Sequence, residues 1–240
     1  MTAKCLVSIW AHPDDEAFGP VGVIQAARAA GMRTVLITAT HGEDGRLGDP
    51  PLATRETLAQ VREAELQAAA EIIGFDRVEL WDYPDGKLSL ADAMELRERI
   101  MAVLNEEQPE VVLTFGPDGI YGHPDHIAIH VVATQAFAQY AALQSLHAEP
   151  RLYYVTVDPE RERQPNAAGD ATAPAPLPAT TIIDVSSHGE VKRRALAAHA
   201  TQHEDWGPLL ELPGWLTTAH LHRAFPPFAA GQPTETALFE

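Results

Sequence analysis

The chain has 240 residues, of which 45% are hydrophobic and 21% are charged, and these proportions are typical of a folded globular protein. The formal net charge is −17, from 17 Lys and Arg against 34 Asp and Glu. This excess argues against nucleic acids and anionic membranes as partners, because phosphate binding depends on Lys and Arg.

The single cysteine, Cys5, lies in an apolar run, where a packed thiol is expected. One cysteine excludes an intrachain disulfide framework and a cysteine-rich zinc module. The sequence shows no secretory cleavage pattern and no apolar run of transmembrane length. We therefore expect a cytoplasmic protein.

Short β-rich runs alternate with longer helical patterns along most of the chain. We predict helices at residues 21–30, 54–73, 90–107 and 125–143, and strands at residues 5–11, 34–40, 77–81, 111–115, 152–157 and 180–185. Gly31, Gly74 and Pro109 stand where three of these helices should end. The alternation is typical of βαβ units, so it predicts an α/β fold with a mostly parallel sheet and helices on both faces.

The last third of the chain has a different composition. Residues 158–179 are rich in Pro and Ala, and we expect them to form an exposed loop. The roughly 60 residues after this loop are too few for a second core. We predict one domain over residues 1–240, with a C-terminal extension that includes a helix at residues 192–206. The final segment, from residue 225, packs either on this domain or on another subunit of a homo-oligomer.

Two turns rich in histidine and aspartate follow two of the predicted strands. The first, HPDDE, spans residues 12–16, and the second, GIYGHPDHIAIH, spans residues 119–130. Every strand of a parallel sheet delivers its next loop to the same carboxyl edge, where open α/β folds bind their ligands. We therefore expect the two turns to meet in space although they lie far apart in the sequence.

Imidazole and carboxylate groups in this pattern indicate a divalent metal site, with three protein ligands and one open position. His12 and Asp15 lie close together across a proline-fixed turn, and His126 is the natural third ligand. His130 lies four residues later, a spacing that also suits a metal pair on a helix. Zn²⁺ is the expected ion, although Fe²⁺ or another divalent ion fits similar donors. A single such turn could equally be an ordinary helix N-terminus, and the second turn favours the metal site.

The neighbouring polar residues predict a hydrolytic mechanism. Asp14 stands beside the predicted ligands, where a carboxylate can take a proton from water that the metal acidifies. His123 is placed to act from the opposite side, as an imidazolium that stabilises an oxyanion or protonates a leaving amine. Asp125 is expected to orient His123, and Tyr121 offers a phenol donor nearby.

The two motifs AHPDDE and GHPDH, with their spacing and α/β order, resemble those of the PIG-L/LmbE-like zinc deacetylases. Enzymes of that family remove the acetyl group from N-acetylglucosaminyl compounds. The resemblance spans about residues 4–130, and it implies a Rossmann-like fold. It also implies roles for six residues: His12, Asp15 and His126 as zinc ligands, Asp14 as general base, and His123 with Asp125 as the acid or electrostatic pair.

Three further segments have open roles. In the predicted helix at residues 54–73, Arg62 and Glu65 lie on adjoining apolar stripes and can pair with each other. The family often has Arg-x-x-Glu there, so Arg62 is either a substrate contact or part of a structural ion pair. His199 resembles the histidine of an H-x-x-Q element in the family, with Gln202 as its partner, and is a predicted substrate-site residue.

The loop HGEDGRLGD, residues 41–49, follows the second predicted strand and reaches the same edge of the sheet. It forms either a lip that contacts a sugar or a mobile turn. Arg46 and Arg55 are expected to be solvated. The family often has a shorter turn here, which leaves the roles of this loop open.

These observations predict metal-assisted N-deacetylation of a small amino-sugar substrate of the N-acetylglucosamine type. A nucleotide-dependent Rossmann oxidoreductase is disfavoured, because carboxylates occupy the turn where a pyrophosphate would bind. The alternative is a non-catalytic metal- or sugar-binding protein on the same scaffold, although such a protein would need neither Asp14 nor His123.

Overall fold

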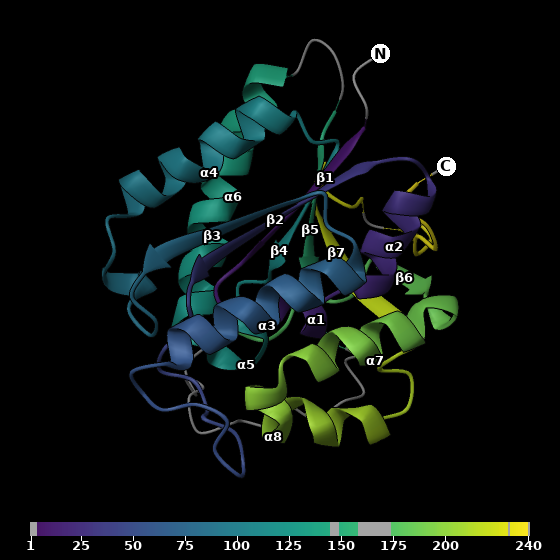
Figure 1. Cartoon of the computed structure of the whole chain (residues 1–240). Helices are drawn as coiled ribbons and strands as arrows, with labels where there is room; N and C mark the ends of the chain where they lie inside the picture. The colour runs from purple at the N-terminus through teal and green to yellow at the C-terminus, as the bar shows by residue number, and fades with distance from the viewer. Residues whose placement is uncertain (1–3, 145–148, 158–173, 230, 240) are drawn as a thin grey trace.

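The computed structural model describes residues 4–144, 149–157, 174–229 and 231–239. Among these residues, seven strands form one sheet in the order β3-β2-β1-β4-β5-β7-β6 (Figure 1). The strands are β1 (Cys5–Trp10), β2 (Arg33–Thr40), β3 (Arg77–Tyr83), β4 (Val111–Phe115), β5 (Arg151–Val155), β6 (Thr181–Asp184) and β7 (Thr218–Phe225).

Helices connect most of these strands. The α-helices are α1 (Asp15–Phe18), α2 (Val21–Ala29), α3 (Leu58–Ile73), α4 (Ala93–Glu107), α5 (Gly119–Gly122), α6 (Pro124–Gln144), α7 (Gly189–Ala198) and α8 (His203–Trp206). The 3-10 helices are η1 (Leu88–Leu90), η2 (Ser186–His188), η3 (Ala200–Gln202) and η4 (Gly207–Glu211). The predicted strands and the four longer predicted helices are confirmed, with ends that shift by a few residues.

The centre of the sheet is parallel, as predicted. β1 pairs in parallel with β2 on one edge and β4 on the other, so that Leu6 lies beside Thr34 and Val111. All six residues of β1 are buried, which accounts for its continuous apolar sequence. β7 is antiparallel to β5 and β6 and is absent from the predicted strands. Its sequence, TAHLHRAF, is only partly buried and carries histidines and an arginine, so its strand pattern is weak.

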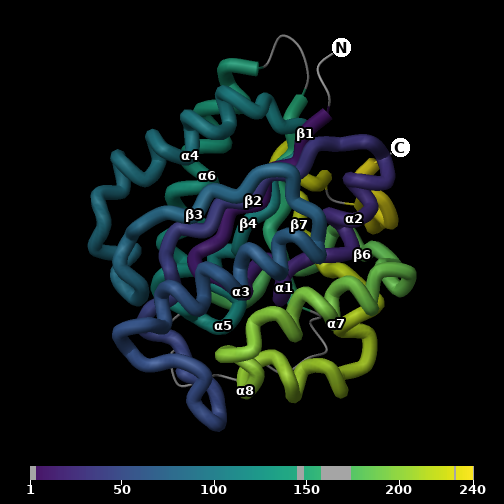
Figure 2. Tube along the Cα trace, viewed as in Figure 1, coloured from purple at the N-terminus to yellow at the C-terminus, as the bar shows by residue number. Residues whose placement is uncertain are grey.

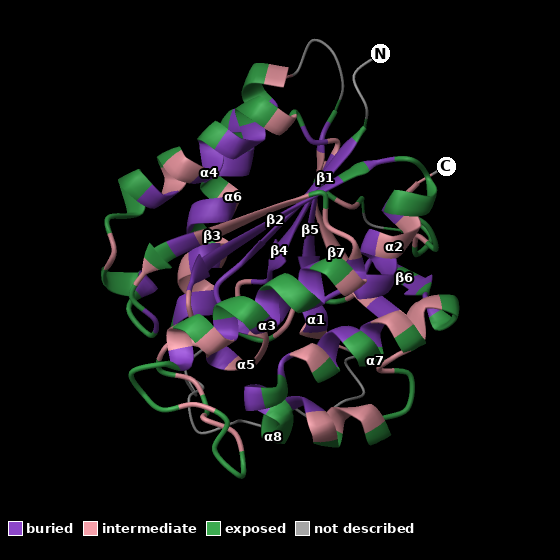
Figure 3. Cartoon of the chain, viewed as in Figure 1, coloured by how far each residue is buried: buried purple, intermediate pink, exposed green. Residues whose placement is uncertain are grey.

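Helices cover both faces of the sheet. α2, α3 and α7 pack against one another on one face, and α4 packs against α6 on the other (Figures 1 and 2). Buried residues fill the central strands β1, β2 and β4 and the inner sides of the helices (Figure 3). Ile24 of α2 and Ile100 of α4 are fully buried, and each such side chain contributes about 1.5–3 kcal/mol to stability. This core fixes the positions of the loops at the carboxyl edge.

The helix predicted at residues 192–206 is interrupted. α7 ends at Ala198, and the chain continues through η3 before α8 begins at His203. Trp206 donates a hydrogen bond from Nε1 to the carbonyl oxygen of His199 at 2.9 Å, and the side chains of this segment bind other elements. These long-range contacts outweigh the helical pattern of the sequence.

The C-terminal tail packs on the domain. Glu235 forms a parallel bridge with Thr181, and its backbone hydrogen bonds extend the edge beside β6. Leu238 is buried in the core. Most of the predicted loop at 158–179 lies outside the described residues, and residues 174–179 form neither helix nor strand. Within the described parts of the chain, no helix is both long enough and apolar enough to cross a membrane.

Candidate metal centre

The turn after β1 has an unusual backbone. Asp14 adopts a left-handed conformation, with φ 115° and ψ −29°, which is rare for residues other than glycine. The Asp15 carboxylate closes the turn by accepting the backbone N–H of His12 at 2.8 Å. The consecutive acidic side chains therefore reach different partners, which are His126 for Asp15, Arg62 for Asp14 and His199 for Glu16.

The turn after β4 is strained as well. Gly119 and Ile120 have φ values of 57° and 68°, and the second is an outlier for a β-branched residue. α6 then begins at Pro124, a residue suited to the first turn of a helix, so Asp125 and His126 follow in that turn. Nδ1 of His126 bonds to the carbonyl oxygen of Gly119 at 3.2 Å. The strained turn thus fixes the His126 ring.

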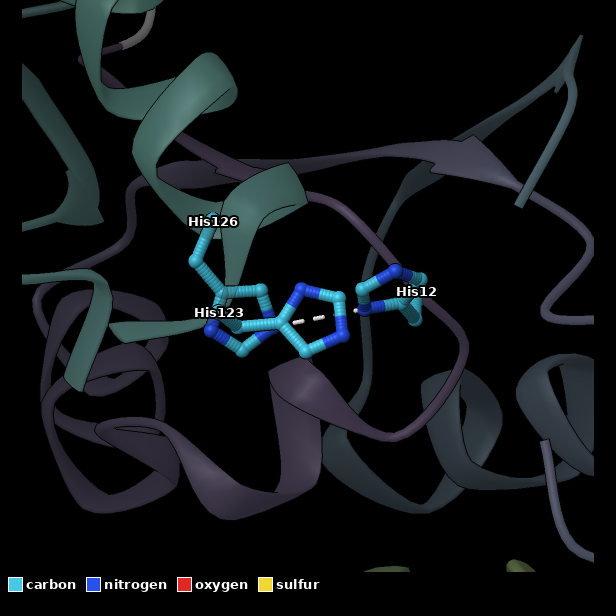
Figure 4. Close-up of side chains that lie close together, drawn as sticks. All are labelled: His12, His123 and His126. Carbon is cyan, nitrogen blue, oxygen red and sulfur yellow. Dashed lines mark hydrogen bonds between the residues drawn. The ribbon is translucent and has the colours of Figure 1, made fainter. Parts of the chain in front are cut away.

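The three predicted metal ligands lie together in the structure. Nε2 of His126 is 3.3 Å from Nδ1 of His12 and 3.3 Å from Oδ1 of Asp15. Oδ2 of Asp15 is 3.5 Å from Nδ1 of His12, and all three residues are buried. Ligand atoms about 2.0–2.1 Å from a tetrahedral zinc ion lie about 3.3 Å from one another. The separations of the donor atoms are therefore close to those in a tetrahedral site, and the dashed line in Figure 4 marks the contact between His126 and His12.

The hydrogen bonds behind both rings direct nitrogen lone pairs toward this centre. Nε2 of His12 lies 3.2 Å from Asp125 and 3.1 Å from Asp85, which places a hydrogen on Nε2 and leaves Nδ1 as the nitrogen that faces the centre. The bond from Nδ1 of His126 to a carbonyl likewise assigns the lone pair to Nε2. Two ring nitrogens and a carboxylate that face one another favour positive charge between them, and this donor set suits a divalent metal.

The pKa shifts of His12 and Asp15 also indicate that this centre favours positive charge. Burial opposes a charged His12 ring, yet the hydrogen bonds to Asp125, Asp15 and Asp85 outweigh it and hold the pKa of His12 well above its usual range. Burial also opposes ionisation of Asp15, yet the His126 and His12 rings hold the pKa of this carboxyl well below its usual range.

His12 also belongs to two wider groups of possible metal donors. One joins His12 with His123 and His126, and the other joins it with Asp85 and Asp125. The Asp85 and Asp125 carboxylates already accept backbone N–H bonds from neighbouring loops. They therefore serve as hydrogen-bond acceptors for the back of the His12 ring. Asp85 follows β3 and was not among the predicted site residues, because an aspartate in a Pro-Asp-Gly turn carries no distinctive signal.

Asp14 precedes Asp15 in the same turn and is held by Arg62. The Arg62 guanidinium donates to Oδ2 of Asp14 at 2.9 Å, to the carbonyl oxygen of Gly42 at 2.8 Å and also to that of Pro13. Among the described residues, Oδ1 of Asp14 accepts no hydrogen bond. Burial raises the pKa of Asp14 to about 7, against the opposing charge of Arg62. A carboxyl group with such a pKa is suited to accept a proton near neutral pH.

His123 stands next to both ligand rings, with centroid distances of 4.8 Å to His12 and 4.6 Å to His126 (Figure 4). The expected imidazolium is not supported, because burial and the charges of His126 and His12 lower the pKa of His123 to about 4. Its Nδ1 accepts the backbone N–H of Asp125 at 3.2 Å, so the neutral ring carries its hydrogen on Nε2. Tyr121 contacts the same group, with its ring 5.7 Å from that of His123.

The predicted role of Asp125 requires a correction. Its side chain does not orient His123; it binds His12 and accepts the backbone N–H groups of Gly86 at 2.8 Å and Leu88 at 3.0 Å. Only the backbone N–H of Asp125 contacts His123. Because Asp125 lies in the first turn of α6, its carboxylate points across the site instead of back along the turn.

The ion pair between Arg62 and Glu65, one of the two roles left open by the sequence, does not form in the structure. Both residues are buried on α3, but Arg62 binds Asp14, while Glu65 accepts the backbone N–H of Thr201 at 2.8 Å and its hydroxyl at 2.6 Å. Residues three apart on a helix can reach each other, yet each of these has a stronger long-range partner. Arg62 therefore reaches the site through Asp14.

His199 is fully buried, and its Nε2 lies 2.5 Å from Oε1 of Glu16. Burial opposes a charge on this ring, but the Glu16 carboxylate outweighs it and raises the pKa of His199. A ring enclosed in this way cannot contact a substrate, which corrects the predicted role. His130 is also turned away from the donors, because its Nδ1 bonds to the carbonyl oxygen of Phe115 at 2.9 Å.

The loop after β2 is tied to the rest of the molecule. Arg46 pairs with Asp205 at 2.9 Å, and Arg55 donates to the carbonyl oxygens of Glu43 and Gly45. Both arginines are exposed to solvent, as expected, and each also has partners within the protein. The backbone N–H of Asp44 donates to Asp85 at 2.9 Å, which connects this loop to the residues behind His12.

The fold and the converging turns define a Rossmann-like α/β protein with a His-Asp-His group arranged for a divalent cation. The model of the family described as GlcNAc-PI de-N-acetylase, PIG-L, matches residues 7–137. A 1D-myo-inositol 2-acetamido-2-deoxy-alpha-D-glucopyranoside deacetylase from Kineococcus radiotolerans is 32% identical, over 82% of this chain and 68% of that protein. The chain therefore belongs to the PIG-L/LmbE-like deacetylase family.

Solved structures confirm the fold. N,N'-diacetylchitobiose deacetylase from Pyrococcus horikoshii is similar with a TM-score of 0.67 and 21% identity, over 92% of this chain and 84% of that one. The 4-carboxy-2-hydroxymuconate hydratase GalB from Pseudomonas putida is similar with a TM-score of 0.66 and 21% identity, over 97% and 100%. One fold thus carries two reactions, so the reaction must be argued from the site and the sequence relatives.

Proposed function

We propose that this protein is a zinc-dependent N-deacetylase that hydrolyses the acetamide of a small N-acetylglucosamine-type substrate. The observation that carries the proposal is the convergence of His12, Asp15 and His126 at 3.3–3.5 Å, with the Asp14 carboxylate beside them. Two relatives at 32% and 33% identity are deacetylases of an N-acetylglucosaminyl inositol. Zinc is favoured by this donor set, and the cytoplasmic location stays a prediction.

His12, Asp15 and His126 would hold the ion, and Asp85 with Asp125 would orient His12 from behind. A divalent cation bound there polarises an amide carbonyl and acidifies water. Asp14 accepts the proton of the attacking water through its Oδ1, because Arg62 already occupies Oδ2. The same carboxyl then returns a proton to the leaving nitrogen.

His123 acts on the other side of the reacting carbonyl. Because its Nδ1 accepts the backbone N–H of Asp125, its Nε2–H is the group available to donate to the developing oxyanion. Tyr121, beside it, offers a second donor at the same edge. Arg62 belongs to the site as the partner of Asp14. The proposal therefore keeps the predicted catalytic residues but gives Asp125 and Arg62 positioning roles.

The proposal is tested by amine release from N-acetylglucosamine and from inositol and disaccharide conjugates of it. Asp14→Asn should lower kcat by about 10²–10⁴-fold, the usual contribution of a general base, while zinc stays near one per chain. Asp82→Asn is the control, since it removes a carboxylate that is 91% exposed near the same edge and should leave kcat within about twofold. Full activity of Asp14→Asn would refute the assignment.

Two further outcomes separate the alternatives. Sugar binding without amine release across the panel would favour a non-catalytic binding protein. Hydration of an unsaturated carboxylic acid without deacetylation would indicate a hydratase, the class of enzyme to which GalB belongs. Removal of the metal with a chelator, followed by addition of Zn²⁺ or Fe²⁺, identifies the ion that restores activity.

A further inference from the structure

One buried segment at the end of α7 joins several parts of the site. His199, Thr201 and Gln202 are all buried, with exposed fractions of 0%, 0% and 3%. His199 binds Glu16 of α1, Thr201 binds Glu65 of α3, and Gln202 exchanges hydrogen bonds with the backbone of Arg46. The segment therefore connects α1, α3 and the loop after β2.

The contact with Glu16 leads directly to Asp14. Oε1 of Glu16 lies 2.5 Å from Nε2 of His199, and Oε2 of the same carboxylate accepts the backbone N–H of Asp14 at 3.0 Å. Glu16 and His199 are both fully buried. A buried carboxylate keeps its place only when a partner compensates for the lost water, and His199 is that partner.

Asp14 needs such a restraint because its backbone is strained. With φ 115°, its peptide group would relax to a more favourable conformation if the surrounding contacts were removed. Arg62 holds the side chain through Oδ2, whereas Glu16 holds the backbone N–H. Two separate contacts therefore hold Asp14, one to its side chain and one to its backbone.

We propose that His199 is a positioning residue, which holds Glu16 so that Glu16 fixes the backbone of Asp14 in the conformation that aims its carboxylate at the metal centre. The catalytic consequence rests on the function proposed above, since Asp14 is its general base. The structural link from His199 to the Asp14 backbone is independent of that function. His199 touches neither substrate nor metal in this arrangement.

The test compares His199→Gln with His199→Asn. The amide nitrogen of Gln can take the place of Nε2 and donate to Glu16. The side chain of Asn is one methylene group shorter, so its amide nitrogen does not reach Glu16. Thr201→Val is the matched control, because it removes a buried hydroxyl in the same segment whose partner is Glu65. Hydrogen exchange of a peptide covering residues 12–18 reports on the Asp14 amide, and kcat, KM, zinc content and Tm are measured in parallel.

We expect His199→Asn to speed exchange of the Asp14 amide at least tenfold and to lower kcat about 10- to 100-fold, with KM and zinc content within about twofold. His199→Gln should restore both exchange and kcat to within about threefold of the parent. Thr201→Val should lower Tm but leave kcat and exchange unchanged. Equal losses of kcat in Thr201→Val and His199→Asn, or unchanged exchange in His199→Asn, would overturn the proposal.

If His199→Asn does not fold, Glu16→Leu provides the same test. Its apolar side chain can neither pair with His199 nor accept the backbone N–H of Asp14, so both bonds are lost, and exchange and kcat should respond as above. Normal exchange and kcat in Glu16→Leu would overturn the proposal. If the parent protein releases no amine but His199→Asn still speeds exchange of the Asp14 amide, the proposed function is refuted and the link from His199 to Asp14 is supported.

Discussion

The carboxylate of Asp125 gives the sharpest test of how the site is held. Asp125 is fully buried, and its two oxygens accept three hydrogen bonds, from Nε2 of His12 and the backbone N–H groups of Gly86 and Leu88. Oδ2 accepts two of these bonds and Oδ1 accepts the third. In Asp125→Asn one oxygen becomes an amide group, which cannot accept a hydrogen bond.

The geometry sets the size of the effect. In the better of its two orientations, the Asn side chain keeps its oxygen toward His12 and Gly86 and turns its amide group toward the N–H of Leu88. One buried N–H is then left unsatisfied, which costs about 1–3 kcal/mol. Loss of the negative charge behind His12 should also weaken Zn²⁺ binding about 10- to 100-fold, because this carboxylate orients the ring and raises its basicity.

Two measurements check this prediction. Urea unfolding of the chelator-treated protein gives the loss of stability, and competition with a chromophoric chelator gives the Zn²⁺ affinity. Asp76→Asn is the control, since its carboxylate also accepts a backbone N–H, that of Thr34 at 2.8 Å, but at the opposite edge of the sheet. That variant should lose stability without losing affinity. A Zn²⁺ affinity of Asp125→Asn within about threefold of the parent would refute the role assigned to Asp125.

Three further predictions follow from single contacts. Gly42→Ala should lower kcat and leave the zinc content unchanged. The new Cβ would overlap the Arg62 guanidinium and displace that group from Asp14, and steady-state kinetics with metal analysis tests this. Gly22→Ala should destabilise the protein by about 1–3 kcal/mol in urea unfolding, since its Cβ would overlap Val185, and an unchanged midpoint would contradict the packing. Cys5 is buried and burial raises its pKa to about 12, so a thiol reagent at pH 8 should modify it only after unfolding.

The sequence predicts the parallel core and the meeting of the two turns for one physical reason. Strands buried on both faces have continuous apolar sequences, as Val111–Phe115 does, and parallel strands place their following loops at one edge. The order of strands and loops therefore suffices to bring His12 near His126. The histidine and aspartate types then indicate a cation without any knowledge of distances.

The roles of individual side chains depend on directions that the sequence does not contain. Arg62 and Glu65 have the spacing of an ion pair, but the positions of the β1 turn and of η3 give each a different partner. Asp125 is two residues from His123, yet the start of α6 at Pro124 turns its carboxylate toward His12. Asp85 is missed because only the arrangement of β3 beside the site gives it a role.

The proposed metal ligands all lie between His12 and His126, yet residues in the C-terminal part of the chain help to hold the turn that carries Asp14. The turn that carries Asp14 has a backbone conformation that local contacts alone do not favour. Its restraints come from Arg62 on α3 and, through Glu16, from His199 at the end of α7. A substitution near residue 199 can therefore change turnover without touching metal or substrate, because the strained turn transmits the change to the carboxylate that accepts the proton.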